Sequence, residues 1–228
     1  MIDRQIEHHV QKHIIGVLIH QKYARFRELR PPKIDTNLYS YHLKVLQKDG
    51  WVLKTDDGYT LSRAGLMYVD RVSLEKLNIR KQPKIVTMLV VQGSNGNILL
   101  QRRTKQPYVA TWTLPYGKIH IDDSSVESAA RREAEEKLGV SCQDMVHAGD
   151  CYIRVYADGQ IFTATLAHVF YTKCDAIEIS DRLQWVRPEE LKNTPELAPA
   201  VKQIVERTLQ QGNIFFDEYT EELALWGS

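Results

Sequence analysis

The chain contains little of what would mark an exported, membrane-spanning or disulfide-stapled protein. Three cysteines occur among its 228 residues, Cys142, Cys151 and Cys174. An odd, scattered set offers neither a disulfide framework nor the spacing of a metal knuckle. No apolar run approaches the ~20 residues that a membrane-spanning helix needs, and residues 1–9 lack the apolar core of a signal peptide. We therefore expect a cytoplasmic protein with no membrane partner.

Glycine- and serine-rich linkers, internal repeats and low-complexity segments are also missing from the sequence. With 43% hydrophobic and 26% charged residues, the composition is that of an ordinary globular protein. Domains usually span about 100–200 residues, so the length allows one large domain or two small ones. The helical pattern ends near residues 78–83, where a proline precedes a β-branched, apolar run. We predict one domain at 1–80, a second at 82–211 and a C-terminal tail at 212–228.

Charge is unevenly distributed along the chain. The formal net charge is +1, but residues 1–80 carry +5 and residues 81–228 carry −4, with histidine counted as neutral. A basic module beside an acidic one favours a polyanionic partner for the first module. The excess is modest, so the motifs have to decide whether that partner is a nucleic acid.

The first domain is predicted to be α+β, with the element order α-α-α-β-β-α. Apolar residues recur at helical spacing at its start, and an Asp-Asp-Gly turn between two apolar stretches predicts a hairpin. Leu38 and Tyr41 are expected among the apolar positions of the third helix. The predicted elements are a helix from Ile6 to Leu18, a short helix around 26–29, a third helix from Asn37 to about Gln47 capped by Asp35 or Thr36, strands at 51–54 and 59–61, and a helix from the cap Ser62 to about Leu77.

Three stretches of this domain, residues 38–46, 49–52 and 59–65, follow the repressor-type pattern Y-H-L-x-x-L-x-x-x-G, a wing, and Y-x-L-T-x-x-G. They resemble the winged helix-turn-helix family over roughly residues 10–75. The resemblance implies that the third helix is a recognition helix, whose N-terminal residues reach base edges in the major groove of double-stranded DNA. Such proteins commonly bind two half-sites as dimers, so it also implies a homodimer.

The polar residues at that end of the third helix are the predicted DNA contacts. Asn37 can read adenine bidentately, and Ser40 and Thr36 can serve bases or phosphates. Lys33 and Lys54 would neutralise phosphates, which makes the affinity for DNA salt-dependent. The predicted DNA-binding set is Lys33, Thr36, Asn37, Tyr39, Ser40, His42, Lys44 and Lys54.

One alternative for this domain stays open, and another is set aside. A winged helix can be a dimerisation or docking module that never touches DNA, and recognition helices of DNA readers usually carry more arginine than this one. His9 and His13 are four residues apart, a spacing that can bind a metal. Without a cysteine or carboxylate cluster nearby, a solvated histidine face is the favoured interpretation.

The second domain alternates strands and helices. This order predicts an α/β fold with a mixed sheet that is covered by helices on both faces. The predicted strands are 84–92, 98–103, 151–156, 162–173 and 183–186, and the predicted helices are 126–138, closed by Gly139, and 199–209.

Several motifs of this domain fall in a fixed order. Residues 112–118 are similar to W-x-L-P-G-G-K, residues 117–140 to the box G-x5-E-x7-R-E-U-x-E-E-x-G-U, and residues 185–191 to W-V-x-x-E-E-L. They resemble the Nudix superfamily over about residues 84–210, and the whole chain resembles Nudix-related transcriptional regulators. The resemblance implies a Nudix α/β/α sandwich, and an activity that hydrolyses a nucleoside diphosphate linked to another moiety with magnesium as cofactor.

The resemblance also implies which residues form the site. Magnesium is a hard cation that takes oxygen ligands, and the box presents Glu133, Glu136 and a carbonyl of the Gly117 loop as its metal ligands. Glu133, Glu136 and Arg132 are the expected catalytic residues. Aromatic and basic side chains near the loop, Tyr108 beside them, can stack on a base or pair with phosphates. The expected ligand-binding residues are Trp112, Tyr116, Gly117, Lys118, Lys137, Arg102 and Arg103.

The box departs from the family pattern in four places. Lys137 stands where the family has a third metal-ligating glutamate, and Tyr116 replaces the first glycine of the loop. The loop after Gly117 is one residue longer, and the early box glutamate is missing. Candidates near that position are Asp122, Asp123 and Ser124. An ammonium in place of a carboxylate changes the site by two charge units, and a Glu133–Lys137 ion pair can fill the space of a magnesium ion. A weakened magnesium site is therefore predicted.

Three hypotheses of function follow. The first is a DNA-binding transcriptional regulator whose Nudix-like domain senses a nucleoside-diphosphate-type ligand with little or no hydrolysis. The second is an active magnesium-dependent pyrophosphohydrolase with an accessory winged helix, which the retained Gly117, Arg132, Glu133, Glu136 and Gly139 favour. The third, a structural or oligomerisation protein, has no specific support in the sequence.

Overall fold

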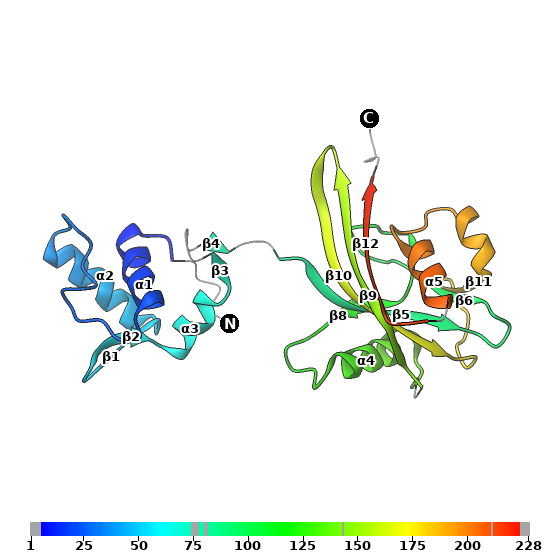
Figure 1. Cartoon of the computed structure of the whole chain (residues 1–228), viewed down its shortest axis with the longest axis horizontal. Coiled ribbons are helices and arrows are strands. Elements are labelled where there is room, and N and C mark those ends of the chain that lie inside the picture. Colours follow the sequence, from blue (N-terminus) through cyan, green and yellow to red (C-terminus); the bar gives the residue numbers. More distant parts are fainter. Residues whose placement is uncertain (1–5, 74–77, 80–81, 143, 211, 224–228) are drawn as a thin grey trace. The chain divides into compact units, whose positions relative to one another are not determined.

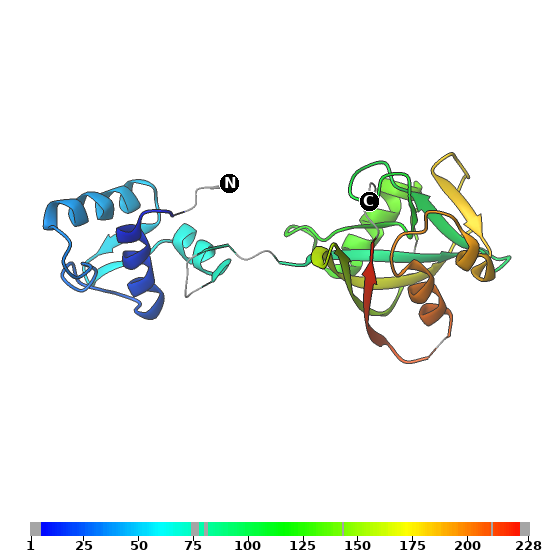
Figure 2. The same cartoon turned by 90° about the horizontal axis from the view of Figure 1, so that it is seen from above.

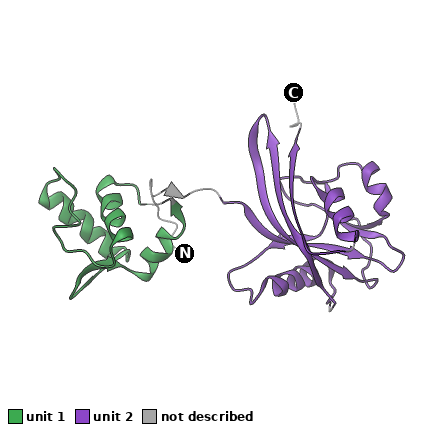
Figure 3. Ribbon diagram, in the orientation of Figure 1, with its two compact units in different colours: residues 1–81 green, residues 82–228 purple. Residues whose placement is uncertain are grey.

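The computed structural model describes residues 6–73, 78–79, 82–142, 144–210 and 212–223. The chain divides into two compact units, residues 1–81 and residues 82–228 (Figure 3). Each unit has its own hydrophobic core, one in the first unit and two in the second. Within the described ranges, no helix combines the length and the apolar character that crossing a membrane requires.

The first unit is built from helices and a small hairpin. Its elements are α1 (His9–His20), α2 (Thr36–Lys48), β1 (Val52–Thr55), β2 (Gly58–Leu61), α3 (Arg63–Val69), β3 (Val72–Ser73) and β4 (Asn78–Ile79). Val10, Ile14 and Leu18 of α1 pack against Leu43 and Leu46 of α2 in one core, as their helical spacing predicts.

Side-chain caps set the helix starts in this unit. The carboxylate of Asp35 accepts the backbone N–H of Asn37 at 2.7 Å and starts α2. The hydroxyl of Ser62 accepts the backbone N–H of Gly65 at 3.0 Å, starting α3, and donates to the carbonyl of Gly50 at 2.5 Å. Ser62 therefore ties the start of α3 to the end of α2.

Two predicted helices of this unit differ in the structure. Residues 25–30 form a turn rather than a helix, because two prolines follow at once and leave room for a single turn that buries Leu29. Helix α3 ends at Val69, about eight residues before the predicted end, because Val72 turns back into the core and starts β3.

The second unit is a three-layer α/β/α sandwich, as expected (Figures 1 and 2). Its strands and helices are β5 (Lys84–Gln92), β6 (Ile98–Arg102), β7 (Trp112–Thr113), β8 (Tyr116–Lys118), α4 (Val126–Leu138), β9 (Val146–Ala157), β10 (Gln160–Lys173), β11 (Leu183–Val186), the 3₁₀ helix η1 (Pro188–Asn193), α5 (Val201–Leu209) and β12 (Phe215–Glu222). The sheet runs β11-β6-β5-β10-β9-β12, with β7 beside β6 and β8 beside β5. It is mixed, since β10–β5 and β12–β9 are parallel and the other pairs are antiparallel.

Helices α4 and α5 cover opposite faces of this sheet (Figure 1). Strand β5 contributes side chains to both cores of this unit, because alternate residues of a strand point to opposite faces of the sheet. Val86 and Val90 pack on the α5 side, and Leu89 and Val91 pack on the α4 side. A strand that is buried on both faces explains the almost unbroken apolar run of β5.

The segment after α5 forms strand β12 along the edge of the sheet. It pairs in parallel with β9, from Phe215 opposite Gly149 to Glu222 opposite Tyr156. A Cβ atom at position 149 would lie 2.5 Å from the ring of Phe215, so Gly149 permits this close approach. The prediction of a tail at 212–228 is wrong for residues 215–222, and residues 224–228 lie outside the described residues.

Candidate functional site

Helix α4 positions the carboxylates of the candidate site. Ser125 caps its start together with Ser128, and Gly139 ends it in the left-handed conformation with φ of 69°. Both ends agree with the predicted helix, 126–138. The face toward the sheet is made of alanine and leucine with one acid among them, Glu133, whose exposed fraction is 4%.

Glu133 lies directly on the loop glycine. A Cβ atom at Gly117 would be 1.7 Å from the carboxyl carbon of Glu133, so the acid occupies the space where any other side chain would begin. Gly117 itself is held in β8, opposite Thr87 of β5. The helix acid and the loop glycine, 16 residues apart in sequence, therefore form one site.

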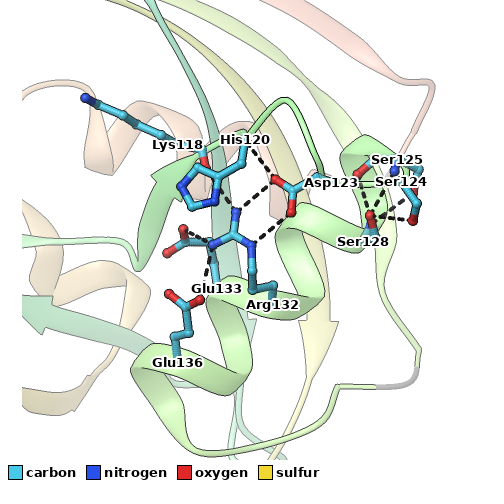
Figure 4. A network of polar contacts seen from close by, with 9 residues as sticks. All are labelled: Lys118, His120, Asp123, Ser124, Ser125, Ser128, Arg132, Glu133 and Glu136. Carbon is cyan, nitrogen blue, oxygen red and sulfur yellow. Dashed lines mark hydrogen bonds and ion pairs between the residues drawn. The ribbon is translucent and has the colours of Figure 1, made fainter. Parts of the chain in front are cut away.

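Arg132 is the centre of the polar network (Figure 4). Its guanidinium donates two hydrogen bonds to Asp123, both at 2.9 Å, and one to the carbonyl of Lys118 at 3.1 Å. It also donates to Glu133 at 2.9 Å and to Glu136 at 3.4 Å. This ion pairing raises the pKa of Arg132 and lowers the pKa of Asp123 to about 2. Arg132 thus links the loop after β8 to α4.

Lys137 binds the other oxygen of Glu133. The ammonium lies 3.0 Å from Oε2 of Glu133, while Arg132 holds Oε1. The ammonium also lies 5.3 Å from the ring centroid of Tyr116. The predicted pairing between residues 133 and 137 is therefore present, and both oxygens of Glu133 are engaged by cations.

The residues present do not fit a magnesium ion as they stand. Magnesium would need the oxygens of Glu133, and those are neutralised by Arg132 and Lys137. The carboxylate of Glu136, with 56% of its side chain exposed, is the less engaged acid of the pair. One exposed carboxylate is a weak ligand set for a cation that favours several oxygens. That the magnesium site is weakened stays a prediction.

Four of the predicted ligand-binding residues gather around Tyr116. Arg103 lies over its ring at 5.1 Å and donates a hydrogen bond to its hydroxyl, and Lys137 approaches the same ring. Lys118 follows Tyr116 by two residues in β8, so the two share a face of the strand. Burial lowers the pKa of Lys84, and the nearby charges of Lys118 and Arg103 lower it further. Burial raises the pKa of Tyr116, so its phenol stays protonated. The result is a partly buried aromatic ring surrounded by cations, which suits a phosphate-bearing aromatic ligand.

Arg102 and Trp112 belong to a different cluster. They pair with each other across β6 and β7, with the guanidinium 5.8 Å from the indole ring. Arg102 also lies 3.9 Å from Glu196, and the backbone of Trp112 bonds to Glu196 and Ala198. Trp112 packs against the α5-side core. These contacts give both residues a structural role, and the prediction that they also bind ligand stays a prediction.

Two residues of the site were missed as contacts by sequence reasoning. Asp123 was one of three candidates near the missing glutamate, and its bidentate pairing with Arg132 identifies it as the acid that braces the loop. Lys84 stands at the start of β5 and joins the cationic group through the sheet. The box arginine, Arg132, needs an acidic partner, and this could have pointed to Asp123 from the sequence. No sequence pattern could have predicted that Lys84 lies near Arg103 and Lys118, because strand pairing in the folded sheet brings it close to them.

The predicted DNA-binding residues separate into exposed and buried sets. Tyr39 is 0% exposed and its hydroxyl donates to the carbonyl of Phe26 at 2.7 Å, so it is a core residue. His42 is 8% exposed and stacks on His8 at 3.7 Å, and burial together with His8 lowers its pKa. The predictions that Tyr39 and His42 contact DNA are corrected accordingly. The hydroxyl of Thr36 is already bonded to Arg30 at 2.9 Å.

The exposed face of α2 carries a different set. Asn37 and Lys44 are exposed, and so is Tyr41, at 62%, although it was expected among the apolar positions. Leu38 is also exposed. Asn37, Tyr41 and Lys44 recur at helical spacing, so they lie along one outward stripe. Ser40 borders this stripe half-buried, and Lys33 and Lys54 are exposed in the loop before α2 and in β1.

Comparison with known proteins identifies the second unit. The NUDIX domain model matches residues 81–208. The uncharacterised Nudix hydrolase YfcD of Salmonella typhi is 32% identical over 127 residues, which cover 52% of this chain and 66% of that protein. The protein of the same name from Escherichia coli K12 is 30% identical over 131 residues, which cover 54% of this chain and 69% of that protein.

The chain is also similar to several solved structures. The NUDIX domain of Shewanella oneidensis NrtR complexed with ADP ribose has 18% identity and a TM-score of 0.49, covering 66% of this chain and 98% of that one. Shewanella oneidensis NrtR with a 27mer DNA has 19% identity and a TM-score of 0.47, covering 55% and 60%. The MutT protein from Bacillus halodurans has 21% identity and a TM-score of 0.48, covering 60% and 90%.

Proposed function

Because this chain belongs to the NUDIX family through residues 81–208, we propose that it is a DNA-binding transcriptional regulator whose Nudix domain senses a nucleoside-diphosphate-type ligand with little or no hydrolysis. The observation that carries the proposal is the state of Glu133. Both of its oxygens are ion-paired, one with Arg132 and one with Lys137. Both carboxylate oxygens of the central acid of the box are therefore bound by cationic side chains of the protein itself.

A site of this kind favours binding over turnover. Lysine can hold a phosphate electrostatically, but an ammonium cannot ligate a metal that activates water. Lys137 and Arg103 flank Tyr116, so a diphosphate can pair with cations while a base or ribose lies against the ring. Stabilisation of the bound ligand without activation of water is what a sensor requires.

The DNA-binding part of the proposal rests on the outward stripe of α2. Asn37 offers an amide that suits adenine, and Lys44 offers a cation for phosphate. Residues 1–80 carry a formal charge of +5, which favours a polyanion. We propose that the first unit is a winged helix-turn-helix domain with α2 as recognition helix, that the protein acts as a homodimer on two half-sites, and that it works in the cytoplasm.

Ligand binding and hydrolysis are tested together on the full chain. Calorimetry with ADP-ribose, NAD and nucleoside di- and triphosphates, with and without magnesium, should find one class that binds below millimolar. The same mixtures should release no phosphate or nucleoside monophosphate at enzymatic rates. Release at about 1 s⁻¹ or faster, abolished by Glu136→Gln, would establish the hydrolase instead. If no nucleotide binds below millimolar, the sensing role is wrong.

DNA binding is tested by gel shift at low salt with fragments from around the protein's own gene. The expected result is retardation that weakens steeply as salt is raised, because phosphate contacts release counterions. Absence of any retardation at micromolar protein would overturn the regulatory role and would favour a docking module.

A further inference from the structure

A second cluster of metal-ligating side chains lies on the sheet, outside the box. His147 and Asp150 belong to β9 and His168 belongs to β10. Nε2 of His147 lies 2.9 Å from Oδ1 of Asp150, and Nδ1 of His168 lies 2.7 Å from the same oxygen. One ligand atom from each of the three residues lies within 4.8 Å of the others. Two imidazoles therefore converge on one carboxylate.

An irregularity in strand pairing makes this convergence happen. His168 and Asp150 are opposite each other in the antiparallel pair, so they share a face of the sheet. Residues 147 and 150 would point to opposite faces in a regular strand. The register shifts here, because Val169 pairs with Gly149 whereas Phe170 pairs with His147. The shift brings His147 back to the face of Asp150, as bulges beside functional sites commonly do.

We propose that His147, Asp150 and His168 bind a divalent transition metal of the zinc class, with a fourth coordination position left open. Two imidazole nitrogens and one carboxylate oxygen suit zinc, whereas magnesium prefers oxygen alone. Three protein ligands with an open position are the pattern of zinc sites that accept a water or substrate oxygen.

Small side-chain shifts convert the hydrogen-bonded cluster into a metal site. Zinc–ligand bonds of about 2.0–2.1 Å place the ligand atoms of a tetrahedron about 3.3 Å apart. The observed separations of 2.7 and 2.9 Å are shorter, so each imidazole would move outward by roughly half an ångström. The imidazole protons that face Asp150 move to the other ring nitrogens, which leaves both inward nitrogens free to bind the ion.

The cluster is open to solvent. The exposed fractions of the three side chains lie between 25% and 35%. Because each side chain keeps part of its surface exposed, the ligand atoms can be reached by an ion from solvent.

This site is distinct from the box site. Across neighbouring strands, Gly117 pairs with Thr87, Thr87 with His168, and His168 with Asp150. Strands lie about 4.8 Å apart, so the backbones of Gly117 and His168 are separated by about 10 Å. The two sites share no residue, and both lie on the same face of the sheet, because residues paired directly across strands point to the same face.

The experiment uses the full chain without an affinity tag, stripped of metal with a chelator and titrated with zinc. We expect one zinc per chain by elemental analysis, and a visible absorption band after substitution with cobalt(II). Asp150→Asn and His168→Ala should each weaken zinc binding at least about tenfold. A folded Asp150→Asn protein, checked by thermal melting, keeps hydrogen-bonding capacity while losing the anionic ligand.

The matched control is the double variant His9→Ala, His13→Ala, which removes the histidine pair spaced four residues apart near the start of α1. It should retain one zinc per chain. Loss of zinc in this control would place the ion on α1 and overturn the proposal. Failure of the unaltered protein to bind zinc stoichiometrically would also overturn it. Displacement of zinc by equimolar magnesium would show that the metal class is wrong.

Discussion

Glu133 shows how one side chain decides the chemistry of its site. A carboxylate with 4% exposure needs partners, because an unpaired buried charge costs several kcal/mol. Arg132 and Lys137 supply them, one for each oxygen. The second partner is a lysine where the family pattern has a glutamate. The contacts that give the buried Glu133 its partners therefore also occupy the oxygens that a metal would need.

The first prediction concerns this pair. Lys137→Glu should strengthen magnesium binding by roughly 10–100-fold, since it removes a competing cation and adds a carboxylate. Magnesium-dependent hydrolysis of a bound nucleotide should rise with it. Titration calorimetry with magnesium and measurement of nucleoside-monophosphate release check both expectations. The control is Lys137→Gln, which removes the cation without adding a ligand. An equal gain in the control would mean that the added carboxylate is not what matters.

The second prediction concerns Asp123 and pH. Arg132 lowers the pKa of Asp123 from 3.8 to about 2. A group whose pKa is lowered on folding stabilises the fold above its unfolded pKa, and this stabilisation is lost as pH falls through the folded pKa. The free energy of unfolding should therefore fall between about pH 4 and pH 2, and Asp123→Asn should remove that part of the fall. Urea denaturation across this range is the measurement, with the exposed neighbour changed in Asp122→Asn as control.

At the scale of elements, the strand at the edge of the sheet carries the third prediction. Phe215 is 4% exposed and packs on Gly149, whereas Phe216 is 62% exposed on the other side of β12. Phe215→Ala should lower the free energy of unfolding by about 3–5 kcal/mol through lost burial and a cavity. Phe216→Ala should change it by less than about 0.5 kcal/mol. Equal effects of the two substitutions in chemical denaturation would contradict the alternation of β12.

Regular elements with their own local signals were predictable from the sequence. Helix α4 was located at both ends, because Ser125 and Gly139 terminate it by local bonding. Strands β5 and β11 were also located from local sequence, because each is a short, largely apolar run between turns. Strand β12 was missed because four of its eight residues are acidic, which is unusual for a strand. The strand that it pairs with, β9, lies some 65 residues earlier in the sequence.

The candidate site was predictable in part. The Glu133–Lys137 pair follows from helical spacing alone. The bidentate partner of Arg132 and the burial of Tyr39 depend on contacts between elements, which periodicity does not contain. The cluster of His147 and its neighbours depends on a shift in register, and a regular alternation would have placed that histidine on the wrong face.

At the scale of the whole molecule, the two units have separate cores and opposite charge. The hydrophobic clusters of residues 6–72 share no member with those of the second unit. The first unit carries the positive excess and the second the negative excess. If the first unit binds DNA as proposed, the negative excess of the second unit disfavours unspecific attraction of DNA to it.

The fourth prediction tests, in the full chain, whether the first unit and not the second binds DNA. Lys44→Ala should weaken binding to all duplexes and reduce the slope of log affinity against log salt by about 1. Asn37→Ala should relax preference at one base position by about 1–3 kcal/mol. Lys173→Ala, an exposed lysine of the second unit, should change neither quantity. Fluorescence anisotropy with a duplex and its single-base variants gives both numbers. An effect of Lys173→Ala as large as that of Lys44→Ala would place DNA elsewhere.

The contact between Gly117 and Glu133 has a consequence for how the sequence can evolve. Because the carboxyl group of residue 133 fills the space where a side chain at 117 would begin, the two positions are not free to diverge independently. A lineage that gains any side chain at 117 must shorten residue 133 or turn its carboxyl group away, which would disturb the contacts of that group with Arg132 and Lys137. Across homologous genes, a side chain at 117 should therefore tend to occur together with changes at positions 132, 133 or 137.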